Sequence, residues 1–110
     1  MITFDTFLDL VLSFPGTIQK PHFERIGFSV TGKKMFATYL AKNNTANIFL
    51  TPLEQSVFCK MDTMNIYPVP NKWGEKGATT FELDRVSMEL LHEALLSAYN
   101  EVAKGKSNIR

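Results

Sequence analysis

The residues best suited to binding chemistry lie in a short segment around the only tryptophan of the chain. Trp73 stands between Lys72 and Lys76, and Gly74 and Gly77 give the segment the composition of a shaped loop. Lysines can hold phosphates while an indole stacks on a base, so the segment suits a nucleic-acid contact. Two alternatives stay open. The indole packs against the edge of the core, because tryptophan is usually largely buried, or it grips a protein partner.

A second pair of cations follows Gly32 at the expected tip of a β-hairpin. Lys33 and Lys34 would project there from the turn. Lysines at a hairpin tip can contact phosphates without reading sequence. They are equally common as residues that protect a sheet edge from aggregation.

A third cluster contains Lys20 and His22 on either side of Pro21, with Arg25 shortly after. Lys20 and His22 would contact an anion if both faced the same ligand. The alternative places Phe23 in the core and leaves the two polar side chains in solvent, because an isolated histidine needs a partner before it acquires a role.

Catalytic chemistry has no comparable support. Cys59 with His22 or His92 lacks a third member, and its neighbours suggest the inner face of a helix, so we expect an inert cysteine. Two histidines and one cysteine far apart have no metal-binding spacing. We therefore expect no enzymatic activity, no metal and no cofactor.

Composition is that of an ordinary globular domain, which we expect to span residues 1–110, with 45% hydrophobic and 21% charged residues. The single cysteine fits a reducing compartment. No apolar run reaches the roughly 20 residues of a membrane span, and the acidic N-terminus is unlike a secretory signal. We expect a cytoplasmic monomer with no membrane partner.

Charge is divided along the chain although the net charge is only +1. Residues 20–76 carry eight Lys or Arg against four acids, whereas residues 82–101 carry one against five. A basic middle segment suits an anionic partner on one face. The alternative is that mixed charges only keep the surface soluble.

Three helices are predicted from apolar residues at helical spacing. Thr3 begins the first, which ends before Pro15. Thr51 and Glu54 form a capping box at the start of the second, which extends to about residue 61. The inward positions of these two helices are predicted to be Phe4, Phe7, Leu8, Val11 and Leu12, and Leu53, Val57, Phe58 and Met61.

The last helix begins at Asp84 or Ser87 and ends near Lys104. Residues 104–110 are expected to form a flexible tail. The apolar stripe of this last helix consists of Leu91, Ala94, Leu95, Ala98, Tyr99 and Val102.

Strands are predicted where apolar residues alternate between turn formers. Residues 17–23, interrupted by Pro21, form at best an edge strand or an extended arm, and residues 71–77 form a loop. The expected strands cover residues 26–30, 35–40, 47–50, 66–69 and 79–83. The order α-β-β-β-α-β-β-α predicts a two-layer α+β domain with an antiparallel sheet and helices on one face.

The whole chain resembles the MmcQ/YjbR family of small bacterial proteins. The resemblance rests on the order and spacing of several short pieces, which are Phe14-Pro15-Gly16, Lys20-Pro21-His22-Phe23, Phe28 to Val30 with Gly32 to Ala37, Asn47 to Pro52, Pro68-Val69-Pro70 with Lys72-Trp73-Gly74, Thr79 to Leu83, and Ser97 to Val102. One departure is Ala78, which stands where many relatives carry a second large aromatic residue.

The resemblance implies a double-wing fold related to the CyaY-like and secretion-chaperone-like folds, and a role in DNA binding. It carries no agreed catalytic residues. We expect a nucleic-acid-binding module, with DNA as the partner, or alternatively a protein-interaction or chaperone-like module that uses the sheet face. The candidate contacts are Lys20, His22, Arg25, Lys33, Lys34, Lys72, Trp73 and Lys76.

Overall fold

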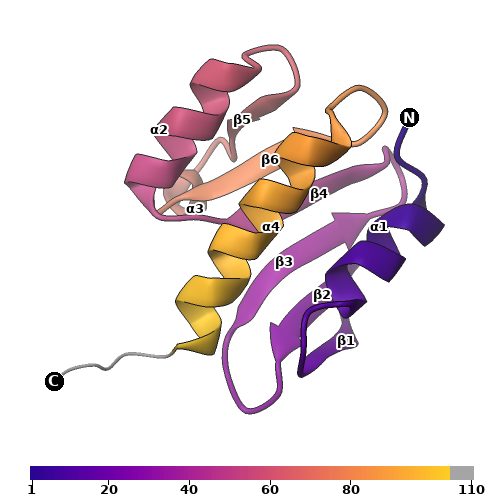
Figure 1. Ribbon diagram of the computed structural model, residues 1–110. Coiled ribbons are helices and arrows are strands. Elements are labelled where there is room, and N and C mark those ends of the chain that lie inside the picture. The colour runs from indigo at the N-terminus through magenta and orange to yellow at the C-terminus, as the bar shows by residue number, and fades with distance from the viewer. Residues whose placement is uncertain (105–110) are drawn as a thin grey trace, which may run out of the picture.

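The computed structural model describes residues 1–104 and has an antiparallel sheet with three helices on one face (Figure 1). This confirms the predicted α+β class. The elements in chain order are α1 (Phe4–Leu12), β1 (Thr17–His22), β2 (Arg25–Val30), β3 (Met35–Leu40), β4 (Thr45–Phe49), α2 (Pro52–Met61), β5 (Ile66–Pro68), α3 (Lys72–Glu75), β6 (Ala78–Glu82) and α4 (Met88–Ala103).

The sheet has the strand order β1-β2-β3-β4-β6-β5. The first four strands form a meander, as hairpins predict. The chain then crosses through α2 to the far edge, forms β5, and returns as β6 between β4 and β5. The segment that joins β5 to β6 contains α3. The position of α3 therefore depends on the edge strand β5 and on its inner neighbour β6.

Local capping signals begin the helices where the sequence predicts them. The hydroxyl of Thr3 accepts a hydrogen bond from the backbone N–H of Thr6, and Thr51 with Glu54 forms the complete capping box. Ser87, rather than Asp84, caps α4 by accepting from the N–H of Leu90. Such caps satisfy backbone donors that have no partner within the helix.

One face of the sheet packs against α1, α2 and α4 (Figure 1). Phe7 of α1 meets Phe28 of β2 edge to face at 5.6 Å between ring centroids, and Phe58 of α2 meets Phe81 of β6 at 6.4 Å. Aromatic pairs of this geometry add to the stabilisation from buried area. The predicted stripe of α4 faces this layer, with Leu91, Ala94, Leu95 and Ala98 fully buried.

The other face of the sheet has no long helix on it. Register places one row of residues on this face across all six strands, because directly paired residues in an antiparallel sheet point to the same side. The row consists of Lys20, Gly27, Thr38, Asn47, Thr80 and Tyr67. We call this side of the sheet the open face.

Two elements differ from the predicted order. Residues 17–22 form a complete strand, β1, at the sheet edge, where Pro21 costs no ladder hydrogen bond. The predicted loop over 71–77 instead contains one helical turn, α3, in which the side chain of Asn71 accepts a hydrogen bond from the N–H of Trp73 at 2.8 Å. An Asn cap is enough to start a turn that glycines alone do not suggest.

The prediction of which α2 residues face the core is largely wrong. Of its four expected inward residues only Phe58 is buried, while Leu53, Val57 and Met61 are exposed. Leu12 of α1 is also exposed. Because α2 lies over the short edge strand β5, the sheet is too narrow there to cover the whole apolar stripe.

Two glycines press the α3 turn against backbone. A Cβ at Gly74 would overlap the carbonyl oxygen of Val69, and a Cβ at Gly77 would overlap that of Leu50. Gln55 reinforces this packing, because its amide donates hydrogen bonds to the carbonyl oxygens of Gly74 at 2.9 Å and Ala78 at 3.1 Å. Only glycine permits such close approach.

The predicted flexible tail lies outside the described residues except for Lys104, which caps α4. None of the helices within residues 1–104 combines the length and the apolar character that crossing a bilayer requires.

We expect Gly77→Ala to lower the free energy of unfolding by about 2–6 kcal/mol, since it combines overlap with Leu50 and a φ of +118°. Gly32→Ala is the matched control, because Gly32 also has positive φ (+75°) but open space around it. The control should lose only about 1–2 kcal/mol. Urea denaturation of both variants measures the difference, and equal losses would contradict the close-packing argument.

Candidate functional site

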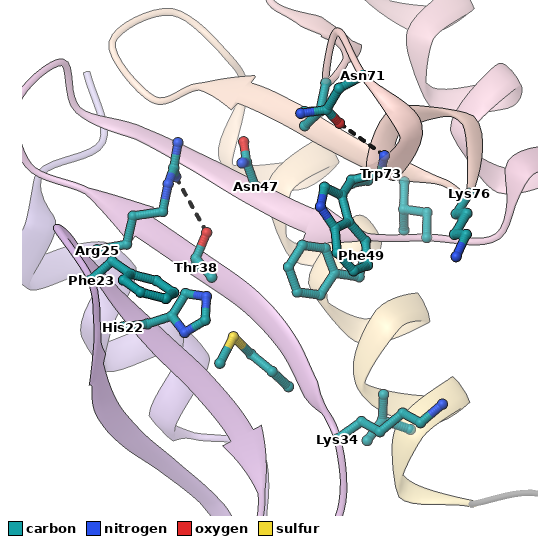
Figure 2. Close-up of a pocket in the computed structure, with 15 residues that line it drawn as sticks. His22, Phe23, Arg25, Lys34, Thr38, Asn47, Phe49, Asn71, Trp73 and Lys76 are labelled. Carbon is teal, nitrogen blue, oxygen red and sulfur yellow. Dashed lines mark hydrogen bonds between the residues drawn. The ribbon is translucent and has the colours of Figure 1, made fainter.

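A cleft of about 810 Å³ lies on the open face, between the β1–β2 turn and α3 (Figure 2). Its floor comes from β3 and β4, and its two sides from the strand turn and the α3 segment. The lining residues are His22, Phe23, Arg25, Lys34, Met35, Thr38, Asn47, Phe49, Leu50, Val69, Asn71, Trp73, Lys76, Ala78 and Val102.

Five of the eight candidate residues meet in this cleft although they are far apart in sequence. They come from all three predicted groups and are His22, Arg25, Lys34, Trp73 and Lys76. The other three do not line it. Lys20 is exposed on the open face at the edge strand, Lys33 is exposed at the hairpin tip, and Lys72 is exposed at the start of α3.

Three cations border the cleft without a carboxylate among its lining residues. Within residues 1–104 the one ion pair joins Lys104 and Glu101, so Arg25, Lys34 and Lys76 have no acidic partner there. The guanidinium of Arg25 donates to the hydroxyl of Thr38 at 3.3 Å, which holds its charge over the sheet. Unpaired cations around a concave surface favour an anionic ligand.

Trp73 projects from α3 into the cleft and is 66% exposed. The alternative in which its indole seals the core edge is therefore wrong. Phe49 of β4 lines the same cleft (Figure 2). The ammonium of Lys76 lies 5.5 Å from the indole centroid, within the range of a cation–π contact. The same helical turn thus presents an aromatic face and a positive charge together.

Phe23 lies on the opposite side of the cleft and is 95% exposed. The alternative that buries Phe23 in the core is wrong. Its ring meets the imidazole of His22 edge to face at 5.0 Å. Its φ of 58° is unusual for a bulky residue, because a two-residue hairpin turn with a positive φ at this position normally uses glycine.

Sequence reasoning missed the polar and aromatic residues of the cleft floor. Asn47 accepts a hydrogen bond from the hydroxyl of Thr80 at 2.8 Å, and its amide nitrogen has no hydrogen-bond partner in the part of the chain that is described. Phe49 follows on the same strand and the same face. The alternation of Asn47 and Phe49 with buried Ile48 was the available signal, but it does not tell which face stays open.

The side chains with a shifted pKa are Tyr39, Cys59 and Tyr67, and none of them lines the cleft. A hydrogen bond to Glu82, with burial, raises the pKa of Tyr67 to about 12. Burial raises the pKa of Cys59, opposite to the change that activates a nucleophilic thiol. Burial and the charge of Asp84 raise the pKa of Tyr39.

The remaining histidine lies outside the cleft. His92 stacks on Phe14 at 6.1 Å between ring centroids, on the helical side of the sheet. Over residues 1–104 there is no group of three His, Cys, Asp or Glu side chains placed to hold a metal ion.

The fold has a counterpart among solved structures. The crystal structure of the Deinococcus radiodurans protein DR2400, a DUF419 domain, is similar with a TM-score of 0.75 and 23% identity, over 90% of this chain and 77% of that one. At this identity the likeness shows a shared fold. DUF419 is the MmcQ/YjbR-like family, so this chain shares its α+β fold with a domain of the family that the sequence resembles. No family model and no curated protein matches the chain.

We expect Phe23→Gly to leave the free energy of unfolding unchanged or to raise it by up to about 1 kcal/mol, despite loss of a large apolar ring. The ring is almost fully exposed, and glycine relieves the positive φ. Phe23→Ala is the control, because it removes the ring but keeps the strain, and it should be less stable than Phe23→Gly. Urea denaturation measures both. A loss above about 1 kcal/mol in the glycine variant would mean that the ring is packed.

Proposed function

We propose that the protein is a non-enzymatic module that binds nucleic acid through the cleft on its open face. The observation that carries the proposal is that three cations without a carboxylate partner in the described residues and two exposed aromatic rings line one concave surface. Cations that hold the backbone and rings that stack on bases are the two parts of such sites.

We also infer that the chain is a member of the MmcQ/YjbR-like family. Two observations support this inference, the ordered series of short sequence pieces and the fold that the DUF419 domain shares with this chain. DNA is then the nucleic acid that the family resemblance favours. The argument for binding rests on the cleft residues, because a fold alone does not carry a function.

Each group in the cleft has a distinct role in the proposal. Arg25, Lys34 and Lys76 hold phosphates, and Trp73 stacks on a base or sugar. Arg25 is steadied by Thr38, so it is the cation whose position depends least on the ligand. Three charges neutralise few phosphates, and binding should therefore be modest and sensitive to salt.

The family resemblance implies two wings, which correspond here to the hairpin turn with Lys33 and Lys34 and to the α3 turn. The two wings contribute different residues to the cleft. The hairpin turn contributes Lys34, while Lys33 is not among the lining residues. The second wing is the α3 turn, which contributes Trp73 and Lys76 but not Lys72. The proposal thus concerns the inner sides of both wings.

One observation favours a protein-interaction role, but it concerns α2 and not the sheet face. Leu53, Val57 and Met61 form an exposed apolar stripe along α2, and Met64 beyond the helix is exposed as well. Apolar stripes of this kind often contact other proteins. A protein partner would therefore be placed on α2, and the open face would remain available to an anion.

We expect binding of labelled DNA at low salt, weakening with a slope of log affinity against log salt between about −2 and −3 for three phosphate contacts. Fluorescence anisotropy at several salt concentrations measures the slope. No binding at low salt, or binding that does not depend on salt, would contradict the proposal.

The lysines on either end of α3 form a matched pair. Lys76→Gln should weaken binding and reduce the salt slope by about 0.7–0.9, because it removes one phosphate contact. Lys72→Gln removes the same charge four residues away, outside the cleft, and should change the slope much less. Equal effects would indicate that net charge, and not the cleft, controls binding.

A further inference from the structure

We propose that the cleft binds a single strand with unstacked bases in preference to a duplex. This inference rests on the proposed function and names the class of nucleic acid that the site takes. It follows from the accessibility of the aromatic rings, from the shape of the cleft, and from the charges on the helices.

The rings are arranged to meet base faces. Phe23 and Trp73 stand on opposite sides of the cleft with their rings largely in solvent, and Phe49 of β4 contributes to the floor (Figure 2). A ring stacks on the flat face of a base. In a duplex these faces are covered by neighbouring base pairs, whereas in a single strand they can be splayed onto a protein surface.

The floor offers groups that can meet base edges. Asn47 uses its side-chain oxygen as acceptor for Thr80, which leaves the amide nitrogen as a donor in the cleft. Asn71 uses its oxygen for the N–H of Trp73 and likewise keeps its amide nitrogen, at the side of the same cleft. Bases in a single strand expose their pairing edges, and side-chain amides bind such edges.

The dimensions of the cleft suit a few nucleotides. Its volume of about 810 Å³ lies within the roughly 300–1,000 Å³ of sites for small molecules. Bases entering one at a time can fill such a concavity, while a duplex would present only its backbone to the rims. The cleft has an aromatic ring on each of two sides and three cations in its lining. This arrangement favours a strand over a mononucleotide, which would contact one side only.

The described helices are poorly charged for entering a DNA groove. Asp5 and Asp9 lie on α1, and Glu89, Glu93 and Glu101 lie on α4. On α2 the exposed side consists mainly of the apolar stripe Leu53, Val57 and Met61, with Lys60 as its one exposed cation. Helices that read the major groove present basic and polar residues to it, so none of the three long helices fits that role.

The test uses Trp73 as its own reporter, because it is the only tryptophan. The full chain is titrated at low salt with an oligothymidylate of about ten nucleotides, with a hairpin duplex of matched charge, and with thymidine monophosphate. We expect the oligothymidylate to quench tryptophan fluorescence and to bind at least about fivefold tighter than the duplex, the smallest preference that stacking of one base supplies.

Variants separate stacking from charge by anisotropy with the same three probes. Trp73→Ala should weaken oligothymidylate binding at least about fivefold, and Trp73→Phe should restore most of it. Phe23→Leu keeps an apolar side chain without a π face and should also weaken single-strand binding. Leu53→Ala is the control, because Leu53 is exposed on α2 outside the cleft and should leave all three affinities unchanged.

The outcomes distinguish the two proposals. Duplex binding as tight as single-strand binding, or tight binding without change in tryptophan fluorescence, would overturn the single-strand inference and leave nucleic-acid binding intact. Thymidine monophosphate binding as tightly as the oligomer would also overturn it and assign the cleft to a free nucleotide. Absence of binding to every probe would overturn the proposed function itself.

Discussion

The close approach of Gly74 and Gly77 to backbone carbonyl groups is the constraint on which the open face depends. These contacts leave no room for a side chain, so the turn between β5 and β6 can take only one position against Val69 and Leu50. Gln55 then ties the turn to α2 through two hydrogen bonds. A rigid turn holds Trp73 away from the core at little entropic cost on binding.

The unequal covering of the two sheet faces follows from the same topology. Three helices bury the apolar side, where Phe28, Phe36 and Phe81 are completely enclosed. The open side keeps cations in contact with water, so they need no carboxylate partners and incur little desolvation cost. A charged cleft therefore exists beside a dry core, and at its edge Phe23 combines a positive φ with an almost fully exposed ring.

The shared fold and the residues of the cleft are independent observations. The fold shared with the DUF419 domain gives the scaffold, and the residues of this cleft give the chemistry. Ala78, which follows the α3 turn, lines the cleft without adding a ring to it. In this chain Phe49 and Phe23 supply the further rings, from β4 and from the β1–β2 turn, so the aromatic surface is built from different strands.

The sequence by itself determined what depends on neighbours along the chain. The caps at Thr3 and Thr51, the buried stripe of α4 and the hairpins of the meander are local, because helix caps and residue periodicity act over a few positions. Five of the eight candidate residues named from the sequence line one cleft, although the sequence alone does not bring them together.

Only the tertiary structure decided which of these residues meet and which side chains remain in solvent. The insertion of β6 between β4 and β5 is a long-range pairing that alternation cannot specify, since a strand pattern does not name its partner. That pairing places α2 over a narrow edge and exposes Leu53, Val57 and Met61. It also brings α3 to the open face, where Trp73 and Lys76 line the same cleft as Arg25.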